Sequence, residues 1–262
     1  MKKLMMFALC MMAWMTCNAQ EYFEGTLKAR SYEKHSDIAI KFSKGMLING
    51  ARDAELHIKG EKMAAVDHVT NVATIYDVEK NKLYFVFHNI KKALEMPISH
   101  FEKMKQGSVS IKPVATSTYK TISGANCRLY SAEVNTNQNG AQIRMKSDSY
   151  VCEEMPIHPS LAGFNNGLPY VGMKYIVDSN NRAGMIQINS YTAYEVQEVI
   201  RGEVDDAIFV VPADYEIVDG TSNVKMLSVY GENNKVMKKM KKSAKQEPVK
   251  ELTFDLNEEW DF

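Results

Sequence analysis

The sequence lacks an excess of either charge, and this balance excludes one broad class of function. Lysine plus arginine total 32, and aspartate plus glutamate also total 32. A protein that binds nucleic acid through the phosphates carries a basic surface, so the composition argues against a nucleic-acid partner. With 45% hydrophobic and 24% charged residues, the chain has the composition of a folded globular protein.

The sequence also lacks the motifs that mark common catalytic and cofactor sites. It contains no GxSxG elbow, no HExxH, no phosphate-binding loop and no Cys-x-x-Cys. Its six histidines are scattered without the spacing of zinc ligands. We therefore expect no cofactor, no metal and no enzymatic activity. Catalysis would need a polar cluster assembled from distant segments, such as His57, Asp178 and Glu195.

Long apolar runs are absent except at the N-terminus. Two lysines precede an apolar stretch at residues 4–15, and residues 17–19 place small side chains at the −3 and −1 positions of a signal-peptidase site. This pattern predicts a signal peptide at 1–19, cleaved after Ala19, and an exported protein that is soluble in the periplasm or outside the cell. Lipidation at Cys17 is an alternative that the preceding residues fit poorly. Later apolar runs reach five residues, far below the ~18 that a membrane helix needs.

What the mature chain does contain is alternation of apolar and polar residues, which is typical of strands with one buried face. No internal repeat is apparent. The alternating or β-branched stretches lie at residues 23–30, 54–59, 141–146, 171–177 and 186–199. Turn-forming pairs separate them at 49–50, 80–81, 139–140, 180–181 and 219–220. The pattern predicts a mainly β domain at 20–220, built as an antiparallel meander.

Helical patterns are scarce. Residues 98–105 are expected to form a short helix capped by Ser99, and residues 160–164 a helical turn. The tail at 221–262 differs in composition, because the run from Lys235 to Lys245 is strongly basic and the last twelve residues carry five acids. We expect a mobile or helical tail with solvated charges. The alternative is an arm that contacts a membrane surface or an envelope protein through Lys235–Lys245.

Three segments resemble a family of secreted envelope proteins of unknown function, whose fold is similar to the lipoprotein-carrier half-barrel of LolA. They are the opening Phe-Glu-Gly at 23–25, the stretch KTISGANCRLY at 120–130 and the stretch FVVPADY at 209–215, which looks like the family's closing strand. The similarity covers residues 22–219. One departure is Tyr-Val-Cys-Glu at 150–153, where the family pattern has a strand with a tryptophan.

The resemblance implies a single curved antiparallel sheet, a half-barrel, with one or two short helices. Such a sheet wraps an apolar concavity that helices and loops partly cover, so it implies a capacity to hold an acyl chain or another apolar ligand. It implies no catalytic residue. Seven residues on apolar runs are candidates for the ligand face: Phe85, Phe87, Met173, Tyr175, Ile186, Ile188 and Phe209. Ordinary core packing is the alternative role for each of them.

Two functions follow from these observations. The first is an exported, non-enzymatic binding protein for a lipid or lipoprotein-like apolar ligand in the cell envelope. The second is an envelope scaffold or interaction protein that holds no small ligand. A cavity larger than ~300 Å³ on the concave face would favour the first, because ligand pockets begin near that size.

The two cysteines of the mature chain invite a prediction from strand register. Asn139-Gly140 is a favoured two-residue hairpin turn, and it would pair residue 138 with residue 141. Every facing pair of such a hairpin has the same index sum, so Cys127 would lie directly opposite Cys152. Counting outward from the turn places the two in a non-hydrogen-bonded pair, where Cα atoms are ~4.5 Å apart.

Exported proteins reside in compartments where thiols tend to pair. We therefore predict a Cys127–Cys152 disulfide, which would contribute on the order of 2–4 kcal/mol to stability. Two alternatives stay open. A β-bulge in the long arm would shift the register and turn the sulfurs apart, or the two residues are free, buried thiols.

Overall fold

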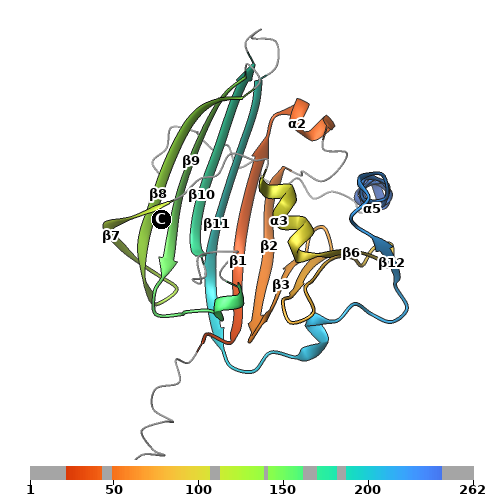
Figure 1. Ribbon diagram of the computed structural model, residues 1–262, viewed down its shortest axis with the longest axis horizontal. Coiled ribbons are helices and arrows are strands. Elements are labelled where there is room, and N and C mark those ends of the chain that lie inside the picture. The colour runs from red at the N-terminus through yellow and green to blue at the C-terminus, as the bar shows by residue number, and fades with distance from the viewer. Residues whose placement is uncertain are drawn as a thin grey trace, which may run out of the picture.

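The structure, a computed structural model, describes residues 22–42, 49–106, 113–138, 141–161, 170–181 and 187–243. The predicted signal peptide at 1–19 lies outside the described residues. Within them the chain is mainly β, as the alternation predicts, and twelve strands form one curved, open sheet (Figure 1). The single curved sheet of the predicted half-barrel is confirmed.

Two successive meanders build this sheet. The first comprises β1 (Gly25–His35), β2 (Gly50–Lys59), β3 (Lys62–Asp67), β4 (Val72–Asp77), β5 (Lys82–Phe87) and β6 (Lys92–Pro97). The second comprises β7 (Val114–Ile122), β8 (Ala125–Gln138), β9 (Ala141–Cys152), β10 (Tyr170–Asn181) and β11 (Gln187–Arg201). Strand β11 pairs with β1, and β12 (Glu216–Asp219) joins the edge at β6, so the order is β12-β6-β5-β4-β3-β2-β1-β11-β10-β9-β8-β7.

The first meander contains a ten-residue repeat that the sequence alone did not reveal. Strands β3 to β6 are each six residues long and are joined by loops of four residues. The last residue of each loop is Asn71, Asn81 or Lys91, with φ of 55°, 53° and 51°. Asp67 and Asp77 accept backbone N–H groups of the loops that follow them. These turn-forming side chains set the period, while the strand sequences between them differ too much to show it.

Helices cover one face of the first meander, which we call the inner face and define by Phe85 and Phe87 of β5. Helix α3 (Ile98–Gln106) confirms the helix predicted at 98–105. Its Phe101 ring lies 6.3 Å from that of Phe85 and 6.5 Å from that of Tyr76, centroid to centroid. Helix α5 (Asn223–Ser243) lies on the same face, where the Tyr230 ring meets Phe87 at 5.0 Å, edge to face.

The opposite, outer face is covered by the segment that follows β11. Its 3₁₀ turn η2 (Asp206–Phe209) places Phe209 in a buried cluster with Ala64, Ile75 and Val86. Farther along, the Tyr215 hydroxyl lies 2.9 Å from His88 Nδ1. Residues 209–215, expected to be a closing strand, are therefore a turn-rich crossing. Pro212 lacks the N–H group that a strand ladder needs, and its carbonyl accepts the Tyr215 N–H in a turn.

Other details also correct the sequence-based expectations. The sheet is not wholly antiparallel, because β12 pairs parallel to β6. The structure has three α-helices within its described residues, α2 (Asp37–Phe42), α3 and α5. The tail from 221 begins with the 21-residue α5, and a 3₁₀ turn η1 (Pro159–Leu161) stands near the predicted 160–164 turn.

The expected turn at 180–181 is wrong, because both residues belong to β10. Asn180 pairs with Gln187 and Asn181 pairs with Ala141, so the ladders with the neighbouring strands extend the strand through them. No helix among the described residues is long and apolar enough to cross a membrane.

The opening glycine is required by the pairing of β1 with β11. Gly25 has a φ of +152°, and a Cβ atom there would overlap the Ile200 carbonyl oxygen. We expect Gly25→Ala to lower the free energy of unfolding by ~2–4 kcal/mol, because the backbone must shift to relieve the contact. Gly231 in α5 is the matched control, since a Cβ there meets nothing within 4 Å.

Urea denaturation of both variants measures the difference. Gly231→Ala is expected to be neutral or to stabilise by up to ~1 kcal/mol, because alanine has the higher helix propensity. Equal stability of Gly25→Ala and the parent protein would show that the β1–β11 contact is not as tight as the structure has it.

Candidate functional site

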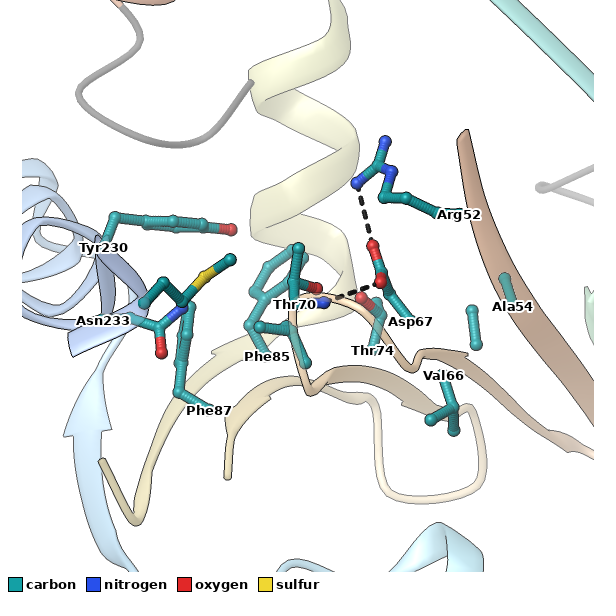
Figure 2. A pocket seen from close by; sticks show the side chains of 13 residues that line it. Arg52, Ala54, Val66, Asp67, Thr70, Thr74, Phe85, Phe87, Tyr230 and Asn233 are labelled. Carbon is teal, nitrogen blue, oxygen red and sulfur yellow. Dashed lines mark hydrogen bonds and ion pairs between the residues drawn. The ribbon is translucent and has the colours of Figure 1, made fainter. Parts of the chain in front are cut away.

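A pocket of about 240 Å³ lies between the inner face of the first meander and helix α5 (Figure 2). Strands β2 to β5 form its floor, and three residues of α5 form a wall. Its lining consists of Arg52, Ala54, Ala65, Val66, Asp67, Thr70, Val72, Thr74, Phe85, Phe87, Tyr230, Asn233 and Met237. The site thus joins chain segments that are about 150 positions apart in the sequence.

Apolar side chains of unequal size shape the floor of the pocket. Ala54 and Ala65 are short, whereas Phe85 and Phe87 are long, and all four line the same hollow. Phe87 is fully buried beneath Tyr230. A helix packed across side chains of such different lengths leaves volume above the short ones, and here that volume is the pocket.

A charged group closes the end of the pocket at β2 and β3. Arg52 Nη1 donates to Asp67 Oδ2 at 2.8 Å, and the other Asp67 oxygen accepts the Thr70 N–H at 2.9 Å (Figure 2). Arg52 also pairs with Glu33, and His35 Nε2 lies 2.9 Å from Glu33 Oε2. The Arg52 side chain is only 12% exposed, and its Nε–H has no hydrogen-bond partner among the described residues.

Helix α5 brings two polar groups to the opposite wall. The Tyr230 hydroxyl points from α5 across the pocket and forms no hydrogen bond with any described residue (Figure 2). Burial raises the pKa of Tyr230 to about 12, so the hydroxyl stays protonated at neutral pH. Asn233 is buried, and its Nδ2 donates only to the weak acceptor Met237 Sδ, at 3.5 Å. Both groups retain hydrogen-bonding capacity for a bound molecule.

The seven candidates for the ligand face fall into four groups. Phe85 and Phe87 line the pocket. Phe209 does not, because it is buried on the outer face, and the prediction for it is wrong. Ile186 lies outside the described residues. The remaining three lie on other strands: Met173 and Tyr175 on β10, and Ile188 on β11. In the sheet order, β1 and β2 separate these two strands from β3.

Little in the sequence indicated the polar lining of the pocket. Arg52 and Asp67 stand in alternating strands where charged residues normally face solvent, and only the strand pairing shows that they meet under α5. Tyr230, Asn233 and Met237 recur at i, i+3 and i+7, which is the spacing of one helix face. That spacing was the feature of the tail sequence from which a helix face shared by these three residues could have been predicted.

The structure does not assemble the trio considered for catalysis. Glu195 of β11 pairs with Gly172 of β10, and Asp178 stands six residues farther along β10. At ~3.3 Å per residue the two are about 20 Å apart along the strand. His57, on β2, pairs with Thr26 of β1. These three residues therefore do not form one site.

The histidines likewise give no metal centre in the part of the chain that the structure describes. His57 Nε2 and His68 Nε2 both approach Glu55 Oε2, at 3.3 and 3.7 Å. Burial lowers the pKa of His57, and its Nδ1 lies 2.8 Å from the Thr26 hydroxyl. No group of three or more His, Cys, Asp or Glu side chains among the described residues is placed to hold a metal ion.

The two cysteines face each other in the predicted register. Cys127 pairs with Cys152, and Gln138 pairs with Ala141, with no bulge between them. The predicted disulfide is nevertheless not what the structure shows, because both residues are free, fully buried thiols. Cys127 Sγ donates to the Ala125 carbonyl oxygen at 3.2 Å, so its sulfur is engaged with the backbone rather than bonded to its partner.

The two thiols also interact with each other. When Cys152 is ionised, the single S–H of Cys127 donates to its sulfur in place of the Ala125 carbonyl, and this contact lowers the pKa of Cys152 to about 7. The same contact and burial raise the pKa of Cys127. The pair therefore releases its first proton from Cys152.

No family model and no curated protein matches this chain, so the function is inferred from the geometry itself.

We predict that Cys127→Ala raises the pKa of Cys152, because the thiolate loses its hydrogen-bond donor while it remains buried. Thiolate absorbance in the far ultraviolet, followed against pH, measures this shift in the folded protein. The fraction of Cys152 ionised at pH 7 should fall relative to the parent protein. Cys152→Ala is the control and should remove the titration near neutral pH. An unchanged midpoint in Cys127→Ala would contradict the hydrogen bond.

Proposed function

We propose that this protein is an exported, non-enzymatic binding protein that holds a small apolar ligand, or the end of a longer acyl chain, between its curved sheet and helix α5. The observation that carries the proposal is the pocket at Phe85, Phe87 and Tyr230. Most of its floor is apolar, and its wall is a helix rather than a second sheet. The two charged side chains among its described lining residues, Arg52 and Asp67, pair with each other. Such an arrangement suits binding of an apolar body more than bond-making chemistry.

The volume limits the size of the ligand. A cavity of ~150 Å³ lined by apolar side chains accommodates benzene, which has six heavy atoms. By proportion, the 240 Å³ pocket accommodates roughly eight to ten heavy atoms. This is below the ~300 Å³ at which pockets for drug-sized ligands begin, so the pocket does not reach the size that the sequence analysis set as favouring a lipid-binding function. The pocket therefore suits a short aliphatic chain or an aromatic ring, and a full lipid would place only part of one chain in it.

The resemblance to the LolA-like half-barrel supports the same proposal independently of the pocket, since that fold implies an apolar ligand. The signal-peptide pattern adds the location, because an envelope protein that carries an apolar ligand must first be exported. An alternative function is an envelope scaffold. The observation in its favour is that α5 presents Lys235, Lys238 and Met240 as exposed side chains, to which a partner protein or a membrane surface could bind.

Filling the pocket should abolish ligand binding. Ala65→Leu adds three carbon atoms to the pocket floor, and we expect it to weaken binding of 1-hexanol at least about tenfold by removing the space for it. Titration followed by two-dimensional NMR measures the affinity and reports whether the variant is folded. Ala213→Leu, at an exposed turn, is the matched control and should bind as the parent does. Absence of hexanol binding by the folded parent protein would overturn the binding proposal and favour the scaffold.

Export should be visible in the mature N-terminus. Expressed with its full sequence in a Gram-negative host, the protein should be recovered from the periplasm or medium beginning at Gln20, since the signal-peptidase site follows Ala19. N-terminal sequencing and intact mass together identify the cleavage. Recovery of the uncleaved chain from the cytoplasm would contradict the export proposal, and a lipid mass on Cys17 would replace it with membrane anchoring.

A further inference from the structure

The polar groups of the pocket indicate which chemical group of a ligand it would bind. Two of them, Asn233 Nδ2 and the Tyr230 hydroxyl, stand on α5, and the Nε–H of Arg52 belongs to the opposite end. All three are hydrogen-bond donors whose capacity the described residues leave unused or only weakly used. A molecule that offers an acceptor oxygen would satisfy them, and an entirely apolar molecule would leave them unsatisfied.

The charge around the pocket decides which acceptor fits. The guanidinium of Arg52 is shared by two carboxylates, those of Asp67 and Glu33. Arg52 and Asp67 are the only lysine, arginine, aspartate or glutamate residues among the described lining residues. One positive charge against two negative charges leaves a net charge near −1. The site thus has no positive charge to spare for an anion.

We infer that the ligand of this pocket is a neutral molecule with a short aliphatic or aromatic body and one carbonyl oxygen, such as an amide or an ester, rather than a carboxylate. This inference rests on the proposed binding function and names its ligand class. The apolar body lies on Ala54, Ala65 and Phe85, and the carbonyl oxygen accepts from the donors on α5. A fatty-acid carboxylate would be excluded, because burying it beside Asp67 adds a third negative charge with no free cation.

The geometry also explains why an ammonium is a poorer fit than a carbonyl. An ammonium group donates hydrogen bonds and accepts none, so it cannot satisfy Asn233 Nδ2. Both oxygens of Asp67 are already occupied, one by Arg52 and the other by the N–H groups of Val69 and Thr70. Neither carboxylate oxygen of Asp67 is therefore directed toward a cation of the ligand.

Three probes with six carbon atoms each separate these possibilities. Hexanamide and hexanoate each have eight heavy atoms and nearly the same shape, so they differ chiefly in charge, and hexylamine supplies the cation. NMR titration of the folded, mature protein at neutral pH gives the three affinities. Hexanamide is expected to bind at least about tenfold more tightly than either ion, since an unpaired charge in a poorly solvated site is strongly disfavoured.

Variants assign the preference to the named groups. Tyr230→Phe and Asn233→Leu each remove a hydrogen-bond donor while nearly keeping the shape of the side chain. Each should weaken the binding of hexanamide severalfold without strengthening the binding of hexanoate. Asn234→Leu, at the next position of α5 and outside the pocket lining, is the matched control and should not alter binding. Glu33→Gln removes one negative charge and should reduce the difference in affinity between hexanamide and hexanoate.

The outcomes are distinguishable. Equal or tighter binding of hexanoate or hexylamine would overturn the inferred ligand class while leaving the binding function in place. Unchanged hexanamide affinity in both Tyr230→Phe and Asn233→Leu would also overturn it, because the donors would then play no part. If neither these probes nor 1-hexanol binds the folded protein, the proposed function fails and this inference fails with it.

Discussion

The pairing of β1 with β11 is the interaction on which the rest of the structure depends. It runs from Gly25 opposite Arg201 to His35 opposite Ser190, and those last two residues are 155 positions apart in the chain. Each meander is otherwise a set of local hairpins, and only this ladder makes them one sheet. Closing so long a loop costs entropy before any contact forms, so the ladder must be long and well matched. The close approach at Gly25 is one sign of that match.

Once the sheet is continuous, the remaining chain can reach both of its faces. The segment after β11 crosses the outer face, where Phe209 and Tyr215 attach it to the first meander. The chain then enters the sheet edge as β12 and turns into α5 on the inner face. The pocket exists because this last helix packs over the earliest hairpins, across Ala54 and Ala65 beside Phe85. It is thus a product of the long-range pairing and of no single segment.

The charged group at Arg52 illustrates how the sheet controls chemistry. Four adjacent strands contribute to it, since Ser190, Glu33, Arg52 and Asp67 lie on β11, β1, β2 and β3. In a partly buried position each ion must be paired, and the strand register supplies the partners. The same pairing leaves the pocket without spare positive charge. The selectivity that we propose for a neutral ligand rests on this pairing rather than on a recognisable motif.

Several features were determined by the sequence itself. Alternation gave the mainly β class, and a two-residue turn together with an index sum placed Cys127 opposite Cys152, because hairpin register depends only on local geometry. The helix at α3 and the apolar pair Phe85 and Phe87 were predictable in the same way. What only the tertiary structure decided is which side chains meet across long separations. Alternation cannot say which face a later segment will cover, so the packing of Phe209, the return of α5 and the grouping of Arg52 with Asp67 beneath Tyr230 depended on the closed β1–β11 ladder.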